Sequence, residues 1–168
     1  MSAPFTYRVV SDGCIDIFFD HKNPGDSSVM GFCGRYKEFD IGSDFDYIGI
    51  RFLPGAFPLL FDVDAKTISD KDHPLGLILP DLSKWMRERI HPDDAFGEIV
   101  KRLSDKLAVE VKRHDNDFDS RFLRALVLIL ERRGMVNTES DLDTGMSPRQ
   151  LRRIFNYYLG TTPKSFST

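Results

Sequence analysis

The sequence has no long apolar segment and few cysteines, and both shortages limit where the protein can work. Its longest purely apolar run is residues 125–130, whereas a membrane-spanning helix needs about 20 apolar residues. The first residues do not combine a basic and an apolar stretch as a secretory signal does. The two cysteines, Cys14 and Cys33, are too few for a disulfide framework. We therefore expect a cytoplasmic protein with reduced thiols and no membrane partner.

Motifs for metal, cofactor and catalytic chemistry are also missing. The four histidines form no His-x-His pair and no glutamate stands at the metal spacing of a cupin, whereas a metal site needs three or four convergent ligands. The chain has no glycine-rich dinucleotide motif, no Walker A motif and no Gly-x-Ser-x-Gly elbow. The sequence therefore predicts no metal, no cofactor and no enzymatic activity.

Acidic residues are absent from residues 145–168, although the chain as a whole is acidic. The basic residues of this segment are Arg149, Arg152, Arg153 and Lys164. Because the whole chain has a net charge of −3, this segment carries +4 and the remainder carries −7. A short basic end on an acidic body indicates one local anionic partner.

The composition is that of a globular protein, with 41% hydrophobic and 29% charged residues. β-prone runs dominate the part of the chain before about residue 80. Strands are expected at residues 6–10, 14–19, 29–32 and 47–52. The Ser-Asp-Gly between the first two runs predicts a hairpin, and the polar stretch 21–28 predicts a loop.

Helical spacing dominates after that point. Helices are expected at residues 56–61, at 82–90, from Asp93 onward, and at 118–133. Apolar residues that share a helix face are expected to be buried: Trp85, Ile90, Phe96, Ile99, Val100, Leu103, Leu107, Phe122, Leu126, Ile129 and Leu130. The predicted fold class is α+β, with a β-rich module at residues 1–80, a helical connector at 81–117 and a helical end at 118–168. The polar stretch 114–117 is the expected linker.

Residues 147–160 carry every signal of a well-defined helix. Ser147 is a suitable N-cap, and Gln150 three positions later completes a capping box. Pro148 suits the first helical position and Gly160 the end. One face of this helix is apolar, with Leu151, Ile154, Phe155, Tyr158 and Leu159.

The opposite face presents Arg149, Arg152, Arg153 and Asn156. A helix about 18 Å long fits a DNA major groove about 12 Å wide. Arginine can contact guanine and asparagine can contact adenine through two hydrogen bonds, and both can reach phosphates. A solvated basic face without a partner is the alternative, because most charge runs have no more specific role.

The order of residues in this segment resembles the first helix-turn-helix of AraC-type transcriptional regulators. The matching residues are Gly145, Ser147, Leu151, Arg153, Phe155, Gly160 and Pro163. Residues 10–18 and 49–56 resemble an uncharacterised β-rich domain that commonly precedes such units. The resemblance implies a cupin-like regulatory module at residues 1–80 and a partial AraC-type unit at 118–168.

The same resemblance implies a DNA-binding transcriptional regulator. Its expected partners are double-stranded DNA, a small-molecule effector, a second copy of the chain and RNA polymerase. Arg149, Arg152, Arg153 and Asn156 would lie in a major groove, and Lys164 would hold phosphates.

Two departures from the family pattern accompany the resemblance. The sequence stops at Thr168, where the helix that joins two helix-turn-helix subdomains would begin, so we expect only the first subdomain. A fragment and a natural short form are both compatible with this. Ser140 and Asp141 occupy the positions where the supporting helix of the family has Leu-Ala.

A second group of polar residues lies in the β-rich half. Asp16 alternates with apolar neighbours on an expected strand, and Arg51 is its candidate partner. Asp12 and Cys14 precede Asp16. This group is either a buried structural ion pair or the polar anchor of a small-ligand pocket. The alternative function for the whole chain is accordingly a small-ligand-binding or protein-interaction module with a vestigial DNA-binding part.

Overall fold

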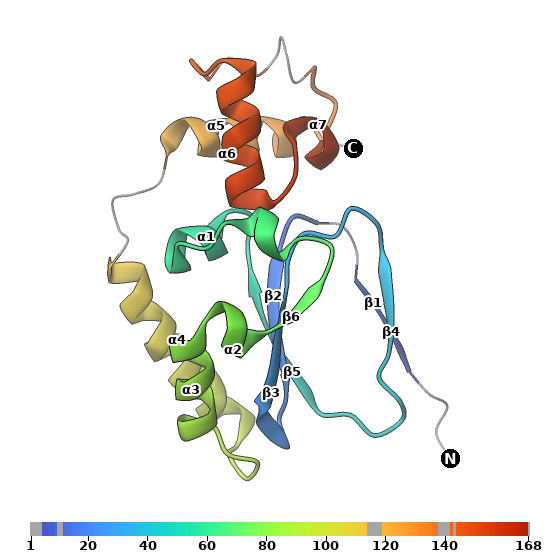
Figure 1. The fold of residues 1–168 in the computed structure, drawn as a ribbon, viewed down its shortest axis with the longest axis vertical. Helices are drawn as coiled ribbons and strands as arrows, with labels where there is room; N and C mark the ends of the chain where they lie inside the picture. Colours follow the sequence, from blue (N-terminus) through green and yellow to red (C-terminus); the bar gives the residue numbers. More distant parts are fainter. Residues whose placement is uncertain (1–4, 10–11, 114–118, 138–141, 143, 168) are drawn as a thin grey trace.

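The computed structural model describes residues 5–9, 12–113, 119–137, 142 and 144–167. Two sheets occupy the N-terminal part and helices follow them, so the protein is α+β, as the sequence predicts. Figure 1 shows the C-terminal helices stacked above one end of the sheet.

The larger sheet contains four strands joined in antiparallel pairs. Its members are β2 (Ile15–Asp20), β3 (Asn23–Met30), β5 (Tyr47–Phe52) and β6 (Asp72–Pro74). Their spatial order is β5-β2-β3-β6. A two-residue turn joins β2 to β3, where the Asp20 carboxylate accepts a hydrogen bond from the Lys22 backbone N–H at 2.9 Å.

The first strand pairs with a different partner from the one expected. β1 (Thr6–Val9) forms a two-stranded sheet with β4 (Lys37–Asp40). The hairpin predicted between residues 6–10 and 14–19 is therefore wrong, and most of the loop predicted at 21–28 is strand β3. Both edges of β2 are already occupied, because Ile17 stands opposite Val29 on one side and Ile50 on the other. No edge of β2 is left for β1.

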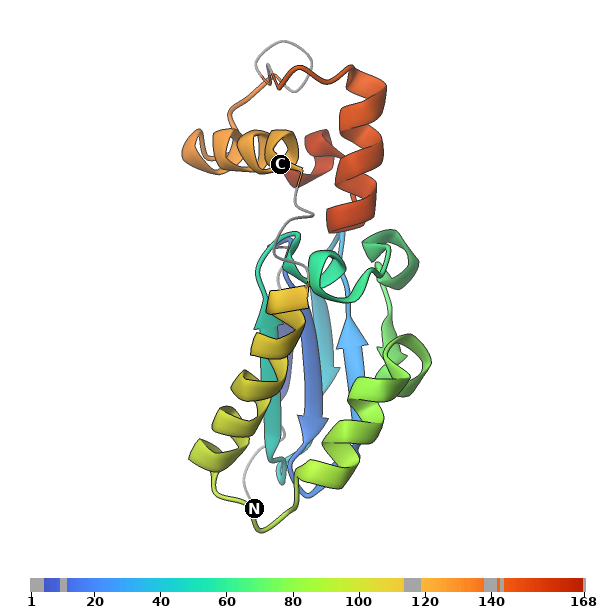
Figure 2. The ribbon, with the colours of Figure 1, turned by 90° about the vertical axis from the view of Figure 1, so that its left-hand side faces the viewer.

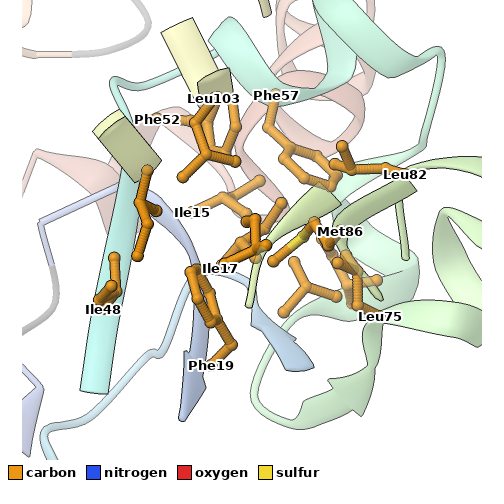
Figure 3. Close-up of a cluster of buried hydrophobic side chains, with 14 of the residues drawn as sticks. Ile15, Ile17, Phe19, Ile48, Phe52, Phe57, Leu75, Leu82, Met86 and Leu103 are labelled. Atoms are coloured by element: carbon orange, nitrogen blue, oxygen red, sulfur yellow. The ribbon is translucent and has the colours of Figure 1, made fainter. Parts of the chain in front are cut away.

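One face of the larger sheet forms the main core. Along β2 the side chains alternate between buried and half-buried, and Ile15, Ile17 and Phe19 point into this core. Figure 3 shows these three residues gathered with Leu75 and Met86 from the covering helices.

Five helical segments contribute to this core. They are α1 (Ala56–Phe61), the 3-10 helix η1 (Ala65–Ile68), α2 (Leu75–Ile78), α3 (Pro80–Arg89) and α4 (Phe96–Arg113). Figure 2 shows α3 and α4 lying along the same face of the sheet. The helices of the predicted connector at 81–117 thus share a core with the sheet, through Leu82, Met86, Ile90, Ile99 and Leu103. The predicted linker and the predicted boundary at 117/118 lie outside the described residues.

Several predicted core positions are buried and three are not. Ile90, Ile99, Leu103, Phe122, Leu126 and Ile129 are buried, and Trp85 and Leu107 are half-buried. Phe96, Val100 and Leu130 are exposed, so these predictions are wrong. Phe96 and Val100 lie on the side of α4 turned away from the sheet. Leu130 lies at the edge of the apolar stripe of its helix, one position beyond Ile129.

The C-terminal helices form a second core. They are α5 (Ser120–Glu131), α6 (Pro148–Leu159) and α7 (Pro163–Phe166). Phe122 and Ile129 from α5 pack there with Phe155 and Leu159 from α6, and Leu142 joins them. No helix in the described part of the chain is both long and apolar enough to cross a membrane.

Candidate functional site

Helix α6 forms as its sequence predicts, because its two ends are fixed locally. The Ser147 hydroxyl accepts a hydrogen bond from the Gln150 backbone N–H at 3.3 Å. In return, the Gln150 side-chain oxygen accepts one from the Ser147 backbone N–H at 2.9 Å. At the other end, Gly160 takes a left-handed conformation with φ 72° and donates its N–H to the Asn156 carbonyl at 2.9 Å. These contacts confirm the predicted capping box and the predicted helix end.

The apolar face of α6 packs on α5. Leu151, Phe155 and Leu159 are buried. The Phe122 ring meets the Phe155 ring edge-on at a centroid distance of 5.2 Å and stacks on Tyr158 at 4.7 Å. Figure 2 shows α5 and α6 crossing steeply, with α6 beside one end of α5. This packing fixes which side of α6 faces solvent.

The solvent side of α6 carries the predicted basic residues. Arg149, Arg152 and Arg153 are all exposed, and none forms an ion pair with another described residue. Asn156 is half-buried, and its side-chain amide donates a hydrogen bond to the Arg152 carbonyl at 2.8 Å on the same helix. The arginines can therefore meet an external partner directly, whereas one N–H of the Asn156 amide is bonded within the helix.

Lys164 lies on α7, next to α6 in the same cluster. Its side chain is exposed, and the Phe166 ring of this short helix meets the Phe155 ring at 6.3 Å. Thr162 caps α7 by accepting a hydrogen bond from the Ser165 backbone N–H at 3.1 Å. The structure thus places Lys164 on an element attached to α6. Ser140 and Asp141, at the expected supporting helix, lie outside the described residues.

The C-terminal end of α6 docks on the N-terminal part of the protein, which the sequence did not indicate. The Tyr157 hydroxyl donates a hydrogen bond to the Asp62 carboxylate at 2.7 Å, just after α1. Burial, and then this hydrogen bond, raise the pKa of Tyr157 to about 12. The Ser69 hydroxyl, just after η1, shares its proton between the Ala65 carbonyl at 2.9 Å and the Gly160 carbonyl at 3.3 Å. The end of α6 with the arginines thus points away from the sheet, and its other end is held (Figure 1).

The second predicted group is brought together around Arg51. Its guanidinium donates to both oxygens of Asp16, through Nε and Nη2, each at 2.9 Å. Its Nη1 donates to the Asp12 carboxylate at 2.9 Å. The other oxygen of Asp12 accepts a hydrogen bond from the Cys14 backbone N–H at 3.0 Å. Burial, with Asp12 as the next cause, raises the pKa of Cys14 to about 11.

This Arg51 cluster lies on the face of the sheet opposite the main core. Asp16 alternates with the buried Ile15 and Ile17, so it points away from the helices. The side chains of Arg51 and Asp16 are 47% and 21% exposed. The pair that the sequence predicts is therefore present, but it is not buried inside the β-rich half. The structure supplies a reason for the pairing, because Asp16 and Arg51 stand directly opposite each other in the β2–β5 register.

The described residues form no cluster of side chains that could bind a metal ion. No group of three or more His, Cys, Asp or Glu side chains converges there. Cys33 is buried with Val9 and Met30 in a small hydrophobic cluster that is separate from the main core. Its thiol donates a hydrogen bond to the Gly31 carbonyl at 3.6 Å.

Comparison with known proteins identifies only the N-terminal part. No curated protein and no solved structure matches the chain. Residues 1–74 match a family model described as a domain of unknown function, DUF6597. The match ends with β6, the last strand of the larger sheet. The β-rich part of the chain is thus similar to an uncharacterised domain family.

Proposed function

We propose that this protein is an AraC-type transcriptional regulator that binds DNA through α6. The observation that carries the proposal is the division of α6 into two faces. One face is locked onto α5 by Leu151, Phe155 and Leu159, and the other presents three exposed arginines. A recognition helix needs this division, because its base-contacting side chains must be free while its backbone is held rigidly.

The position of the arginines along α6 fits a groove-binding helix. In a helix-turn-helix, residues near the start of the second helix contact the base edges. Arg149, Arg152 and Arg153 lie in the first half of α6, at the end that points away from the sheet. Arginine is the side chain that most often contacts guanine in the major groove.

The roles of the two other proposed residues differ from those of the arginines. Asn156 is half-buried, and one N–H of its amide is bonded to the Arg152 carbonyl of the same helix. Its side chain would have to turn before it could contact adenine through two hydrogen bonds, so we assign it a lesser part. We assign Lys164 to a phosphate contact, which would add affinity without sequence preference. A small-molecule effector, a second copy of the chain and RNA polymerase remain proposed partners.

One observation favours a protein-interaction module as the second candidate function. Leu123, Val127 and Leu130 form an exposed apolar stripe along α5. Such a stripe would serve protein contact rather than DNA contact, because DNA-binding surfaces are polar and basic.

Selection from a randomised duplex pool, followed by fluorescence anisotropy at two salt concentrations, tests the proposal. The enriched duplex should bind more tightly than a scrambled one, and the affinity should fall as salt rises. Arg152→Ala or Arg153→Ala should weaken binding to the enriched duplex by about 1–3 kcal/mol and relax its preference. Arg35→Ala, an exposed arginine of the N-terminal part, is the matched control and should bind as the parent does. Absence of any enriched sequence would favour the interaction module.

A further inference from the structure

A cleft lies where the C-terminal helices meet the N-terminal part of the protein. Its volume is about 360 Å³, within the range of small-molecule pockets. Both parts of the chain contribute to its lining. The residues used below are Asp12, Phe32, Ile129, Leu130, Arg133 and Phe166.

The two walls of the cleft are held close together at its edge. Gly13, beside Asp12, has φ 76° and lies against the Phe166 ring, so a methyl group added at Gly13 would collide with that ring. Phe166 in turn packs on the second core through Phe155. The cleft is therefore bounded by elements of both parts in direct contact, and junctions of this kind are frequent ligand sites.

The floor of the cleft is apolar. Phe32 and Ile129 are 6% and 2% exposed, and Phe166 is half-buried. Leu130, which the core does not use, extends this apolar surface to the opening. A ligand with a ring or a short alkyl chain would bury apolar surface here.

The two charged residues of the lining, Asp12 and Arg133, differ in whether they already have an ion-pair partner. The Asp12 carboxylate is held by Arg51 and by the Cys14 backbone N–H, so its position and charge are already compensated. Arg133 forms no ion pair or side-chain hydrogen bond with another described residue. Its backbone has φ 51°, a left-handed conformation that residues other than glycine rarely adopt. This conformation, continued by Gly134, ends α5 and sets Arg133 at the cleft.

We infer that this cleft binds a small amphipathic monocarboxylate. The planar guanidinium of Arg133 matches a carboxylate through two parallel hydrogen bonds. Phe32, Ile129, Leu130 and Phe166 surround the apolar part of the ligand. Asp12 on the facing wall is already paired with Arg51, so Arg133 is the charge of the lining that is left for the ligand.

Binding at this junction has a consequence for α6, and that consequence alone rests on the proposed DNA-binding function. A ligand between the walls contacts Phe166, which packs against Phe155 of α6. A ligand can change the balance between two arrangements only if it contacts them differently. The cleft can meet this condition because its two walls come from different parts of the chain, with Phe32 in the N-terminal part and Phe166 on α7.

Calorimetric titration of the full chain with phenylacetate, benzoate and octanoate tests the inference without any DNA. Phenylacetamide, which lacks the charge, is the matched control ligand. At least one carboxylate should bind saturably, and the corresponding amide should bind at least about tenfold more weakly, equivalent to about 1.4 kcal/mol. Arg133→Gln should abolish this difference, and Arg133→Lys, which keeps the charge but loses the fork, should retain part of it.

Arg124→Gln, on the exposed side of α5 and outside the cleft, should leave carboxylate binding unchanged. Circular-dichroism melts would confirm that each variant is folded. The inference is overturned if none of the three carboxylates binds saturably, or if folded Arg133→Gln binds the carboxylate as the parent does. Because no DNA is present, neither outcome bears on the proposed DNA binding.

Discussion

Replacement of Gly160 by alanine is the sharpest test of how α6 docks on the N-terminal part. Gly160 ends α6 with φ 72°, and it lies against Ala65, the first residue of η1, and Ser69, which follows η1. A β-carbon added at Gly160 would collide with the Ser69 hydroxyl and would stand 2.9 Å from the Ala65 carbonyl oxygen. The hydroxyl can rotate away, but the carbonyl belongs to the backbone of η1. The end of α6 must therefore move.

Gly145 provides a matched control for the size of the effect. It has φ 71°, yet no atom from the described part of the chain, apart from its own neighbours, lies within 4 Å of the β-carbon that alanine would add there. Gly145→Ala should thus lose only the cost of a left-handed alanine, about 1–2 kcal/mol. Gly160→Ala should lose this and about 1–3 kcal/mol more, the usual cost of forcing extra volume into a packed site.

Urea unfolding measures both variants against the parent. Gly160→Ala should unfold at a clearly lower midpoint than Gly145→Ala, with an unchanged slope if only stability has changed. Adding Ser69→Ala to Gly160→Ala should recover part of the loss, because the hydroxyl is gone and the Ala65 carbonyl remains. Equal stability of the two glycine variants would refute the docking of α6 on η1.

Three further predictions concern single groups. Asp16→Asn should lower the free energy of unfolding in urea by about 1 kcal/mol, because the ion pair between Asp16 and Arg51 is partly exposed to solvent. A loss of about 3–5 kcal/mol, typical of a fully buried pair, would contradict this. Ultraviolet titration should show Tyr157 ionising near pH 12, and Tyr157→Phe should lack this step. The stabilisation from the bond between Tyr157 and Asp62 should be fully present below pH 10 and should be lost as the pH rises through about 12. Mass spectrometry should find that Cys14 is alkylated more slowly than free cysteine at mildly alkaline pH. The reason is that the Cys14 pKa of about 11 leaves little of this thiol as thiolate. Equal alkylation rates would disprove the raised pKa.

Local signals allowed the sequence to predict α6 and its faces. The Ser147–Gln150 capping box and Gly160 act within the helix itself, so no distant contact was needed. Strand pairing was harder to predict, because it depends on which of several distant segments pairs most favourably with a given strand. The Asp-Gly before β2 favoured a local hairpin, but Val29 and Ile50 occupy both sides of Ile17.

The sequence also predicted only some of the contacts in the candidate site. Alternation along β2 pointed to a partner for Asp16, and Arg51 is that partner. The exposure of the pair could not be predicted, because it depends on the side of the sheet that the helices leave uncovered. The bond from Tyr157 to Asp62 joins residues 95 positions apart, and no periodic pattern marks such a contact.

The most direct test of the central claim is a map of the residues that DNA touches. Backbone amide NMR signals would be followed as the enriched duplex is added to the full chain, with a scrambled duplex as the reference. The account predicts that the largest specific shifts fall on Arg149, Arg152, Arg153 and their neighbours in the first half of α6, with smaller, sequence-independent shifts around Lys164. Specific shifts confined to the N-terminal sheet or to α3 and α4, with α6 unchanged, would contradict it.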